Sequence, residues 1–229
     1  MTTPIKVFDL DFTLLKGDSS HLWCYFLVEK GLIADPQAFL AREDELMQRY
    51  NRGVSRVEDF IGFSSPAVAA IPFSQLEKLL DEYVETKLRP LKTVEGQALI
   101  TECQEKGIPC VVISATASYI VKRAAAIFGV PAADVLAVDV AVKDDHLTTE
   151  IVGVPSFREG KITRLKMWLE QKGITDPEIS FYTDSINDLP LCLMAKHPYA
   201  INASPALAAE AQAHGWEQEE WHCAGEAAQ

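Results

Sequence analysis

The sequence predicts an α/β protein with a doubly wound parallel sheet and a smaller, inserted all-helical part. From residue 91 onward, short apolar runs alternate with helical patterns, which is typical of a parallel sheet covered by helices. Residues 16–90 instead carry apolar residues at helical spacing and show little strand character. We therefore expect a Rossmann-like core formed by residues 1–15 and 91–229, with residues 16–90 forming an inserted helical domain.

Residues 5–10 are expected to form the first buried strand, because an apolar run there ends on acidic residues. The following core elements are helix 93–106, strand 110–113, helix 117–129, a hairpin at 135–152 with its turn at 143–146, helix 160–172, strand 179–183, helix 187–195, strand 198–201 and helix 205–214. Between glycines and prolines, the insert is expected to hold helices at 20–31, 36–52, 55–63 and 73–88. The polar tail after Trp221 is expected to be disordered.

Composition narrows the class of partner. A net charge of -12 disfavours a nucleic-acid interface or an anionic membrane surface, so we expect a small-molecule partner. The N-terminus lacks the pattern of a secretion signal, and no apolar run reaches the roughly 18 residues that span a membrane, so we expect a cytoplasmic protein. The five scattered cysteines form no C-x-x-C pair and are expected to be buried free thiols. The sequence leaves the oligomeric state open.

Chemically capable side chains follow the predicted strands at the edge where parallel sheets bind ligands. They are Asp9 and Asp11 after the first strand, Ser114 after strand 110–113, Lys161 at a helix start, and Asp184, Asn187 and Asp188 after strand 179–183. Clustered carboxylates repel one another unless a hard cation such as Mg²⁺ lies between them, and a carboxylate can attack phosphorus. Each residue alone also has an ordinary role, as a helix cap or a solvated side chain. Their joint occurrence favours a catalytic site.

These residues carry a family resemblance. The segments 8–15 (Phe-Asp-Leu-Asp-Phe-Thr-Leu-Leu), 111–116 (Val-Val-Ile-Ser-Ala-Thr) and 182–191 (Tyr-Thr-Asp-Ser-Ile-Asn-Asp-Leu-Pro-Leu), with Lys161, resemble the four motifs of the haloacid dehalogenase (HAD) superfamily. A helical insert between the first two motifs resembles the phosphoserine-phosphatase-like branch, subfamily IB, with its C1 cap. Segments 14–23 and 155–165 are similar to a histidinol-phosphatase-like bacterial subgroup. The resemblance implies a Mg²⁺-dependent phosphatase.

The resemblance also implies a role for each motif residue. Asp9 would be the nucleophile, and Asp11 would protonate the leaving alkoxide and then activate water. The side chains of Asp9 and Asp184 and the backbone carbonyl of Asp11 would hold Mg²⁺. Ser114, Lys161 and backbone amides after Asp9 would bind phosphate oxygens. Asp188 would steady the metal and Lys161, with Asn187 close to the phosphate.

Two neighbouring residues are less clearly assigned. Thr13 would orient Asp9 or the turn, or alternatively cap a helix. Phe12 stands where the superfamily usually has glycine. It would either pack beneath the cap, which we favour, or form the pocket wall for the leaving group.

The substrate has to be chosen by the cap. Asp18 falls where phosphoserine enzymes place the acid that meets the substrate ammonium, whereas stretch 57–64 contains no arginine to pair a substrate carboxylate. An amine-bearing phosphate such as histidinol phosphate fits this pattern best, with Trp23, Tyr25 and Phe63 as candidates to stack on its imidazole. A phosphoserine phosphatase, a phosphotransferase, a phospho-receiver and a non-enzymatic binding protein are the alternatives.

Overall fold

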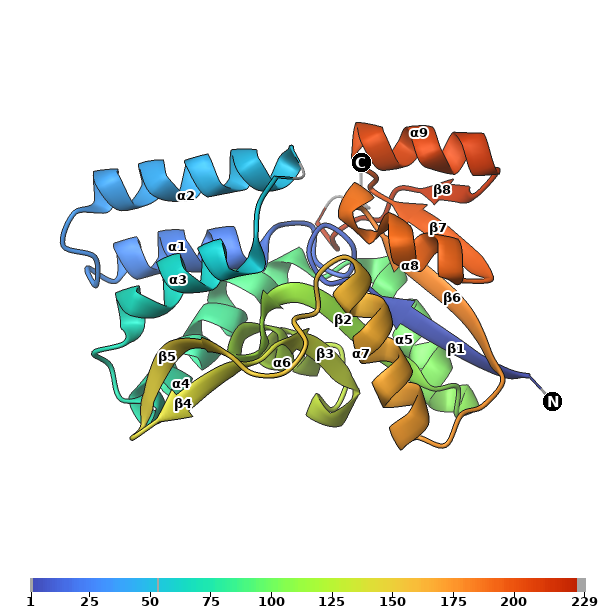
Figure 1. Cartoon of the computed structure of the whole chain (residues 1–229), viewed down its shortest axis with the longest axis horizontal. Coiled ribbons are helices and arrows are strands. Elements are labelled where there is room, and N and C mark those ends of the chain that lie inside the picture. The colour runs from blue at the N-terminus through green and yellow to red at the C-terminus, as the bar shows by residue number, and fades with distance from the viewer. Residues whose placement is uncertain (1, 53, 226–229) are drawn as a thin grey trace.

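A six-stranded parallel sheet lies at the centre of the computed structural model, which describes residues 2–52 and 54–225 (Figure 1). Its strands, in the spatial order β3-β2-β1-β6-β7-β8, are β3 (Val135–Val138), β2 (Cys110–Ala117), β1 (Thr3–Phe8), β6 (Pro177–Thr183), β7 (His197–Ile201) and β8 (Glu217–Glu219). Neighbouring strands pair in parallel throughout. The chain builds outward from β1 to one edge and from β6 to the other, so the strand order reverses between β1 and β6. Ligands bind beside such a reversal, at the carboxyl ends of the strands.

Helices cover both faces of the sheet because the strands are apolar on both faces. On one face, Phe8 of β1 packs in a cluster with residues of α5 (Val94–Lys106) and α6 (Ser118–Ala126). On the other face, Val7 packs with residues of α7 (Glu159–Gln171), α8 (Leu189–Met194) and α9 (Pro205–His214). The predicted doubly wound α/β class is confirmed.

The insert is helical wherever the structure describes regular elements in it. Its elements are α1 (Ser19–Glu29), α2 (Pro36–Asn51), α3 (Val57–Val68), α4 (Phe73–Tyr83), a π-helical turn at Val84–Leu88 and a 3-10 turn at Arg89–Leu91. Aspartates start the first two helices: Asp18 accepts hydrogen bonds from the first turn of α1, and Asp35 does so for α2. In Figure 1, α1, α2 and α3 lie together beside the core, in blue to teal.

The predicted hairpin at 135–152 was wrong in its first strand. Residues Val135–Val138 are all buried and join the main sheet as β3 beside β2. The hairpin itself is shorter, formed by β4 (Val140–Lys143) and β5 (His146–Ile151). Asp144 and Asp145 turn it with φ of 49° and 61°, the left-handed pair that two-residue hairpins need. A continuous apolar run belongs in a buried parallel strand, whereas an exposed hairpin tolerates polar residues.

The hairpin also contacts the insert. The backbone carbonyl of Asp145 accepts a hydrogen bond from the Phe73 amide, and its carboxylate accepts from the amide and hydroxyl of Ser74 at 3.1 and 2.9 Å. A core segment therefore starts α4 of the insert.

The prediction of disorder after Trp221 was wrong for residues 222–225, and the remainder of that tail lies outside the described residues. The Trp221 side chain is buried, and Cys223 pairs with Thr93 in an isolated β-bridge. His222 hydrogen-bonds to Glu95 at the start of α5. The composition is polar, but one buried tryptophan is enough to anchor the segment against the core.

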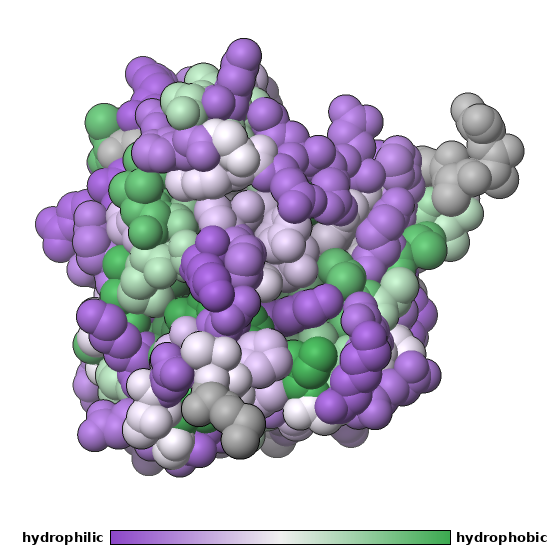
Figure 2. Space-filling model, turned by 90° about the vertical axis from the view of Figure 1, so that its right-hand side faces the viewer, coloured by the Kyte–Doolittle hydropathy of each residue, from purple (hydrophilic) through white to green (hydrophobic). Residues whose placement is uncertain are grey.

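The described surface offers no membrane-spanning element. No helix between residues 2–52 or 54–225 is long and apolar enough to cross a bilayer. Figure 2 shows one face on which hydrophilic side chains predominate and apolar ones are scattered. Among the described residues the cysteines form no disulfide; four are buried and Cys110 is half-buried.

Candidate active site

Asp9 is placed by the central strand pair. β1 ends at Phe8, and the Asp9 amide donates to the Tyr182 carbonyl at 2.9 Å, which continues the pairing with β6 by one residue. The residue is only 6% exposed, and its Oδ1 accepts from the Leu10 amide at 2.8 Å. Burial raises the pKa of Asp9 well above its usual value, and Lys161 opposes this rise. One carboxylate is thus held rigidly at the carboxyl edge of the sheet.

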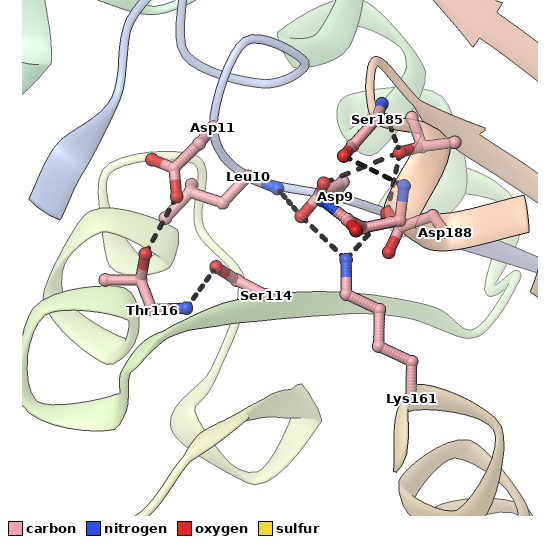
Figure 3. A network of polar contacts seen from close by, with 10 residues as sticks. Asp9, Leu10, Asp11, Ser114, Thr116, Lys161, Ser185 and Asp188 are labelled. Carbon is pink, nitrogen blue, oxygen red and sulfur yellow. Dashed lines mark hydrogen bonds and ion pairs between the residues drawn. The ribbon is translucent and has the colours of Figure 1, made fainter. Parts of the chain in front are cut away.

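Lys161 reaches the same point from α7 (Figure 3). Its ammonium donates a hydrogen bond to Asp188 Oδ2 at 2.7 Å and lies 3.2 Å from Asp9 Oδ1. The Thr183 hydroxyl also donates to Asp188 Oδ2 at 2.7 Å. Burial alone would lower the pKa of Lys161, but Asp188 and Asp9 outweigh it and hold that pKa above its usual value. The 2% exposed lysine therefore stays charged.

The start of α7 explains how Lys161 is aimed. A Cβ at Gly160 would lie 2.0 Å from the Pro155 carbonyl oxygen, so only glycine allows this close passage. Arg158, two residues earlier, has a left-handed φ of 50° and donates from Nε and Nη2 to Asn187 Oδ1 at 3.3 Å each. The buried Asn187 is thereby tied to the loop that carries the lysine.

Asp184 leaves the site with an excess of negative charge. Its pKa is raised well above the usual value by burial and then by Asp9 and Asp188. Within the described residues, the Asp184 side chain makes no hydrogen bond, although it lines the same cavity as Asp9. Three carboxylates share one lysine, and a free carboxylate facing a cavity is the oxygen donor that a hard divalent cation binds. This donor set fits Mg²⁺.

Asp11 has surroundings of its own. Its Oδ1 accepts from the Ser19 amide at 2.7 Å and its Oδ2 from the Thr116 hydroxyl at 2.9 Å, so it points toward α1 and the end of β2 (Figure 3). Burial, followed by repulsion from Asp18, raises the pKa of Asp11 to about 7. A carboxyl group titrating near neutrality can both give and take a proton. The two aspartates of the first motif are therefore electrostatically distinct.

Ser114, Thr13 and Phe12 complete the loops around these acids. The buried Ser114 lines the cavity, and its hydroxyl accepts from the Thr116 amide at 3.1 Å. The buried Thr13 hydroxyl makes no hydrogen bond among the described residues, so it neither orients Asp9 by such a bond nor caps a helix. Phe12 has a φ of 53°, is 43% exposed and lines the cavity, so the favoured expectation that it packs beneath the cap was wrong.

A cavity of about 590 Å³ joins the acids and Lys161 to the helices of the insert. Its wall is mainly apolar and aromatic, formed by Phe12, Met47, Tyr50, Phe60, Ile61 and Tyr119. The three predicted stacking residues are not among its lining residues. Trp23 is buried in the core cluster, Phe63 stacks on Phe39, and Tyr25 is 42% exposed beside His21. The helical period placed aromatics on helix faces but did not show which face meets the cavity.

Asp18 lines this cavity and also starts α1. Its Oδ1 accepts from the amides of Ser20 and His21, both at 2.8 Å. Burial raises the pKa of Asp18, and these two amides partly oppose the rise. Among the described lining residues, Lys161 is the one cationic side chain. The wall of the insert therefore offers a substrate one carboxylate and no positive charge.

A family model described as haloacid dehalogenase-like hydrolase matches residues 7–192, which hold every residue of this acidic cluster. The chain belongs to the haloacid dehalogenase-like hydrolase family. A histidinol-phosphatase of Neisseria meningitidis serogroup C is 31% identical over 93% of this chain and 96% of its own length. The chain is thus an enzyme of the phosphatase branch of the HAD family.

Solved structures share the fold. A Bordetella pertussis protein of unknown function is 37% identical, with a TM-score of 0.88 over 96% of this chain and 99% of that one. A phosphoserine phosphatase, solved as a phospho-aspartyl intermediate analogue, is 18% identical, with a TM-score of 0.65 over 97% of this chain and 95% of that one. At that identity the second likeness shows the HAD fold alone.

Sequence reasoning missed several residues of the site. Thr116 and Thr183 lie inside the recognised HAD motifs. The sequence did not show that their hydroxyls would donate hydrogen bonds to Asp11 and Asp188. Arg158 lies just before the motif lysine and gave no signal beyond that proximity. Tyr50 had no sequence signal, because an aromatic residue in an amphipathic helix is usually a core residue.

Proposed function

We propose that this HAD protein is a Mg²⁺-dependent phosphomonoester hydrolase that acts through a phospho-aspartate at Asp9. We further propose that its substrate is a small amine-bearing phosphate, with histidinol phosphate as the first candidate. The observation that carries the proposal is the single cavity in which Asp9, Lys161 and Asp184 face a wall whose one charged group is Asp18. In this assignment residues 16–90 act as the cap, and residues 1–15 and 91–229 as the catalytic core.

The first half-reaction follows from the two distinct aspartates. Asp9 attacks phosphorus while Lys161 and Ser114 hold non-bridging oxygens, and the ester P–O bond breaks as the new bond to Asp9 forms. Asp11, protonated below its pKa of about 7, gives its proton to the departing alkoxide. The buried ion pair with Asp188 keeps the Lys161 ammonium directed at Asp9.

In the second half-reaction Asp11 is ionised and takes a proton from water, which attacks the phosphorus of phospho-Asp9. Orthophosphate leaves and Asp9 is regenerated. The side chains of Asp9 and Asp184 and the Asp11 carbonyl would hold Mg²⁺, which supplies positive charge next to the transferring phosphoryl group. Asn187, tied to Arg158, closes the phosphate side of the cavity.

The charge of the wall supports the substrate class. A substrate ammonium would pair with Asp18, and an imidazole would rest against Met47 and Phe60. Among the described lining residues, a substrate carboxylate would meet no cation other than Lys161, which the phosphoryl group already uses. The histidinol-phosphatase named among the relatives agrees with this reading. Phosphoserine, the second candidate, carries the carboxylate that the wall does not accommodate.

Phosphate release from histidinol phosphate, phosphoserine and phenyl phosphate, with and without Mg²⁺, tests the proposal. We expect activity only with Mg²⁺ and a kcat/KM for histidinol phosphate at least about 10-fold above that for phosphoserine, since an unpaired buried charge costs more than this factor. A preference for phosphoserine would refute the substrate class. If, with an added alcohol acceptor, less phosphate than substrate-derived alcohol were released, the enzyme would be a phosphotransferase instead.

Asp18→Asn is the matched variant for the amine. Asparagine is as good a helix cap as aspartate, so α1 keeps its start while the charge is removed. We expect KM for histidinol phosphate to rise about 10- to 100-fold, because a charged hydrogen bond contributes roughly 1.5–3 kcal/mol, and KM for phenyl phosphate to stay unchanged. An equal rise in KM for both substrates would refute the ammonium role.

A further inference from the structure

Tyr50 is the aromatic residue that joins the insert to the loop before Lys161. It lies at the end of α2, and its ring centroid is 5.8 Å from that of Phe60 in α3, with the rings perpendicular. On the other side it is 5.9 Å from Phe157, which precedes α7 in the core. The ring is therefore fixed between a cap helix and the segment that aims the catalytic lysine.

The Tyr50 hydroxyl is unpaired within the part of the chain that the structure describes. It makes no hydrogen bond among the described residues, and Tyr50 lines the cavity together with Asp9, Lys161 and Asp184. Burial raises the pKa of Tyr50, and Asp188 raises it further, so the hydroxyl is a protonated donor at neutral pH. A tyrosine hydroxyl without a protein partner, in a cavity shared with charged side chains, is suited to bind a ligand oxygen.

Its position favours the phosphate over the leaving group. The ring packs on Phe157, which lies just before α7 and its Lys161, and Tyr50 lines the cavity together with Lys161 and Asp9. Tyr83, deeper in the insert, is fully buried, and its hydroxyl donates to the Ser19 carbonyl. Of these two cap tyrosines, Tyr50 lines the cavity, and its hydroxyl makes no hydrogen bond among the described residues.

We propose that the Tyr50 hydroxyl donates a hydrogen bond to a non-bridging phosphoryl oxygen of the substrate, so that the cap completes the phosphate site. This rests on the proposed phosphomonoesterase function. A phosphoryl group presents three non-bridging oxygens, and Lys161 and Ser114 supply two side-chain donors from the core; a third from the cap stabilises charge that grows during transfer. Transfer then requires α2 to be seated against Phe157.

Tyr50→Phe tests the hydroxyl, because phenylalanine keeps the ring between Phe60 and Phe157. We expect kcat/KM to fall about 10- to 100-fold, and by the same factor, on phenyl phosphate and on histidinol phosphate. Calorimetry on the Mg²⁺-loaded full chain should show orthophosphate binding weakened about 10-fold or more. Tyr25→Phe, an exposed cap tyrosine away from the cavity, is the control and should stay within about twofold of the parent on all three readouts.

Two results would overturn the proposal. If the kinetics and the orthophosphate affinity were unchanged in Tyr50→Phe, the proposed hydrogen bond would be ruled out. If the loss were confined to histidinol phosphate, the hydroxyl would lie against the leaving group instead. The orthophosphate measurement needs no turnover and no particular ester. If the parent protein shows no preference for amine-bearing esters, the substrate proposal fails, and the Tyr50 comparison can still be made.

Discussion

The two halves of the cavity differ in how they are built. The core half holds four aspartates and one lysine, delivered by strand ends and one helix start. Asp9, Asp11, Asp188 and Lys161 pair with other side chains, whereas Asp184 makes no side-chain hydrogen bond among the described residues. The cap half is mainly aromatic and aliphatic, with Asp18 as its one charged group among the described residues. The core half is suited to a reaction that is the same for any phosphate ester. The cap half is suited to choosing which ester enters.

This difference predicts that substitutions in the two halves will differ in which substrates they affect. Changes in the core half should reduce phosphate release from every ester, whereas changes in the cap half should reduce it only for esters whose alcohol contacts the cap. Tyr50 is the informative exception, because it is a cap residue that we assign to the phosphate.

Asp9→Asn should have the largest effect and defines the core half. An amide cannot serve as the nucleophile, so phosphate release should fall by about 10⁴-fold or more on every ester. Steady-state assays on histidinol phosphate and phenyl phosphate measure this, with thermal unfolding as the control for folding. Substantial activity in Asp9→Asn on either ester would rule out the phospho-aspartate.

Asp11→Asn should follow, with a loss of about 10²- to 10⁴-fold that is largest for esters with poor leaving groups. The parent should show the titration itself. Because Asp11 donates a proton first and its pKa is raised to about 7, its active form is lost as pH rises, and kcat/KM should decline above about pH 7. A pH profile measures this limb. If the decline persisted unchanged in the residual activity of Asp11→Asn, another group would be responsible.

Mg²⁺ should stabilise the core half measurably. At about 100 times its Kd, a ligand adds about 2.7 kcal/mol, which for a chain of this size raises Tm by roughly 5–10 °C. Asp184→Asn should lose this shift. A calorimetric or fluorescence melt with Mg²⁺ or chelator measures both.

Asp184→Asn also tests, in the absence of metal, whether ionisation of Asp184 destabilises the folded protein. The pKa of Asp184 is raised in the folded state, so the folded protein loses stability relative to the unfolded chain as pH rises and the carboxyl ionises. Without Mg²⁺ at neutral pH, Asp184→Asn should therefore melt above the parent. A lower Tm in the absence of metal would contradict the charge crowding inferred at this site.

Asp145→Gly should have the smallest effect and touches neither half of the cavity. Glycine tolerates the left-handed turn, so the variant removes only the carboxylate that starts α4. We expect a loss of about 0.5–1 kcal/mol and a Tm lower by roughly 1–4 °C, with kcat and KM unchanged. A change in KM for histidinol phosphate would show that the hairpin helps to position the cap.

Much of the fold was predictable because the periodicities are strong. Helix 205–214 was predicted at its observed bounds, and helix 93–106 and strand 198–201 to within one residue. The hairpin and the C-terminal tail were predicted wrongly, and both errors have one cause. Whether Val135–Val138 pairs with β2, and whether Trp221 finds a buried position, depends on partners more than 20 residues away in sequence.

The sequence by itself determined which chemical groups are available at the edge of the sheet. Parallel strands present their carboxyl ends at one edge, so acids placed directly after β1 and β6 must meet there, whatever the rest of the chain does. Only the tertiary structure decided how those groups are divided. It set Asp9 against Lys161 and Asp11 against Thr116, and it turned Tyr50 rather than Trp23 or Tyr25 toward the cavity. These choices depend on the packing angle and rotation of each helix, which a repeating pattern of apolar residues does not specify.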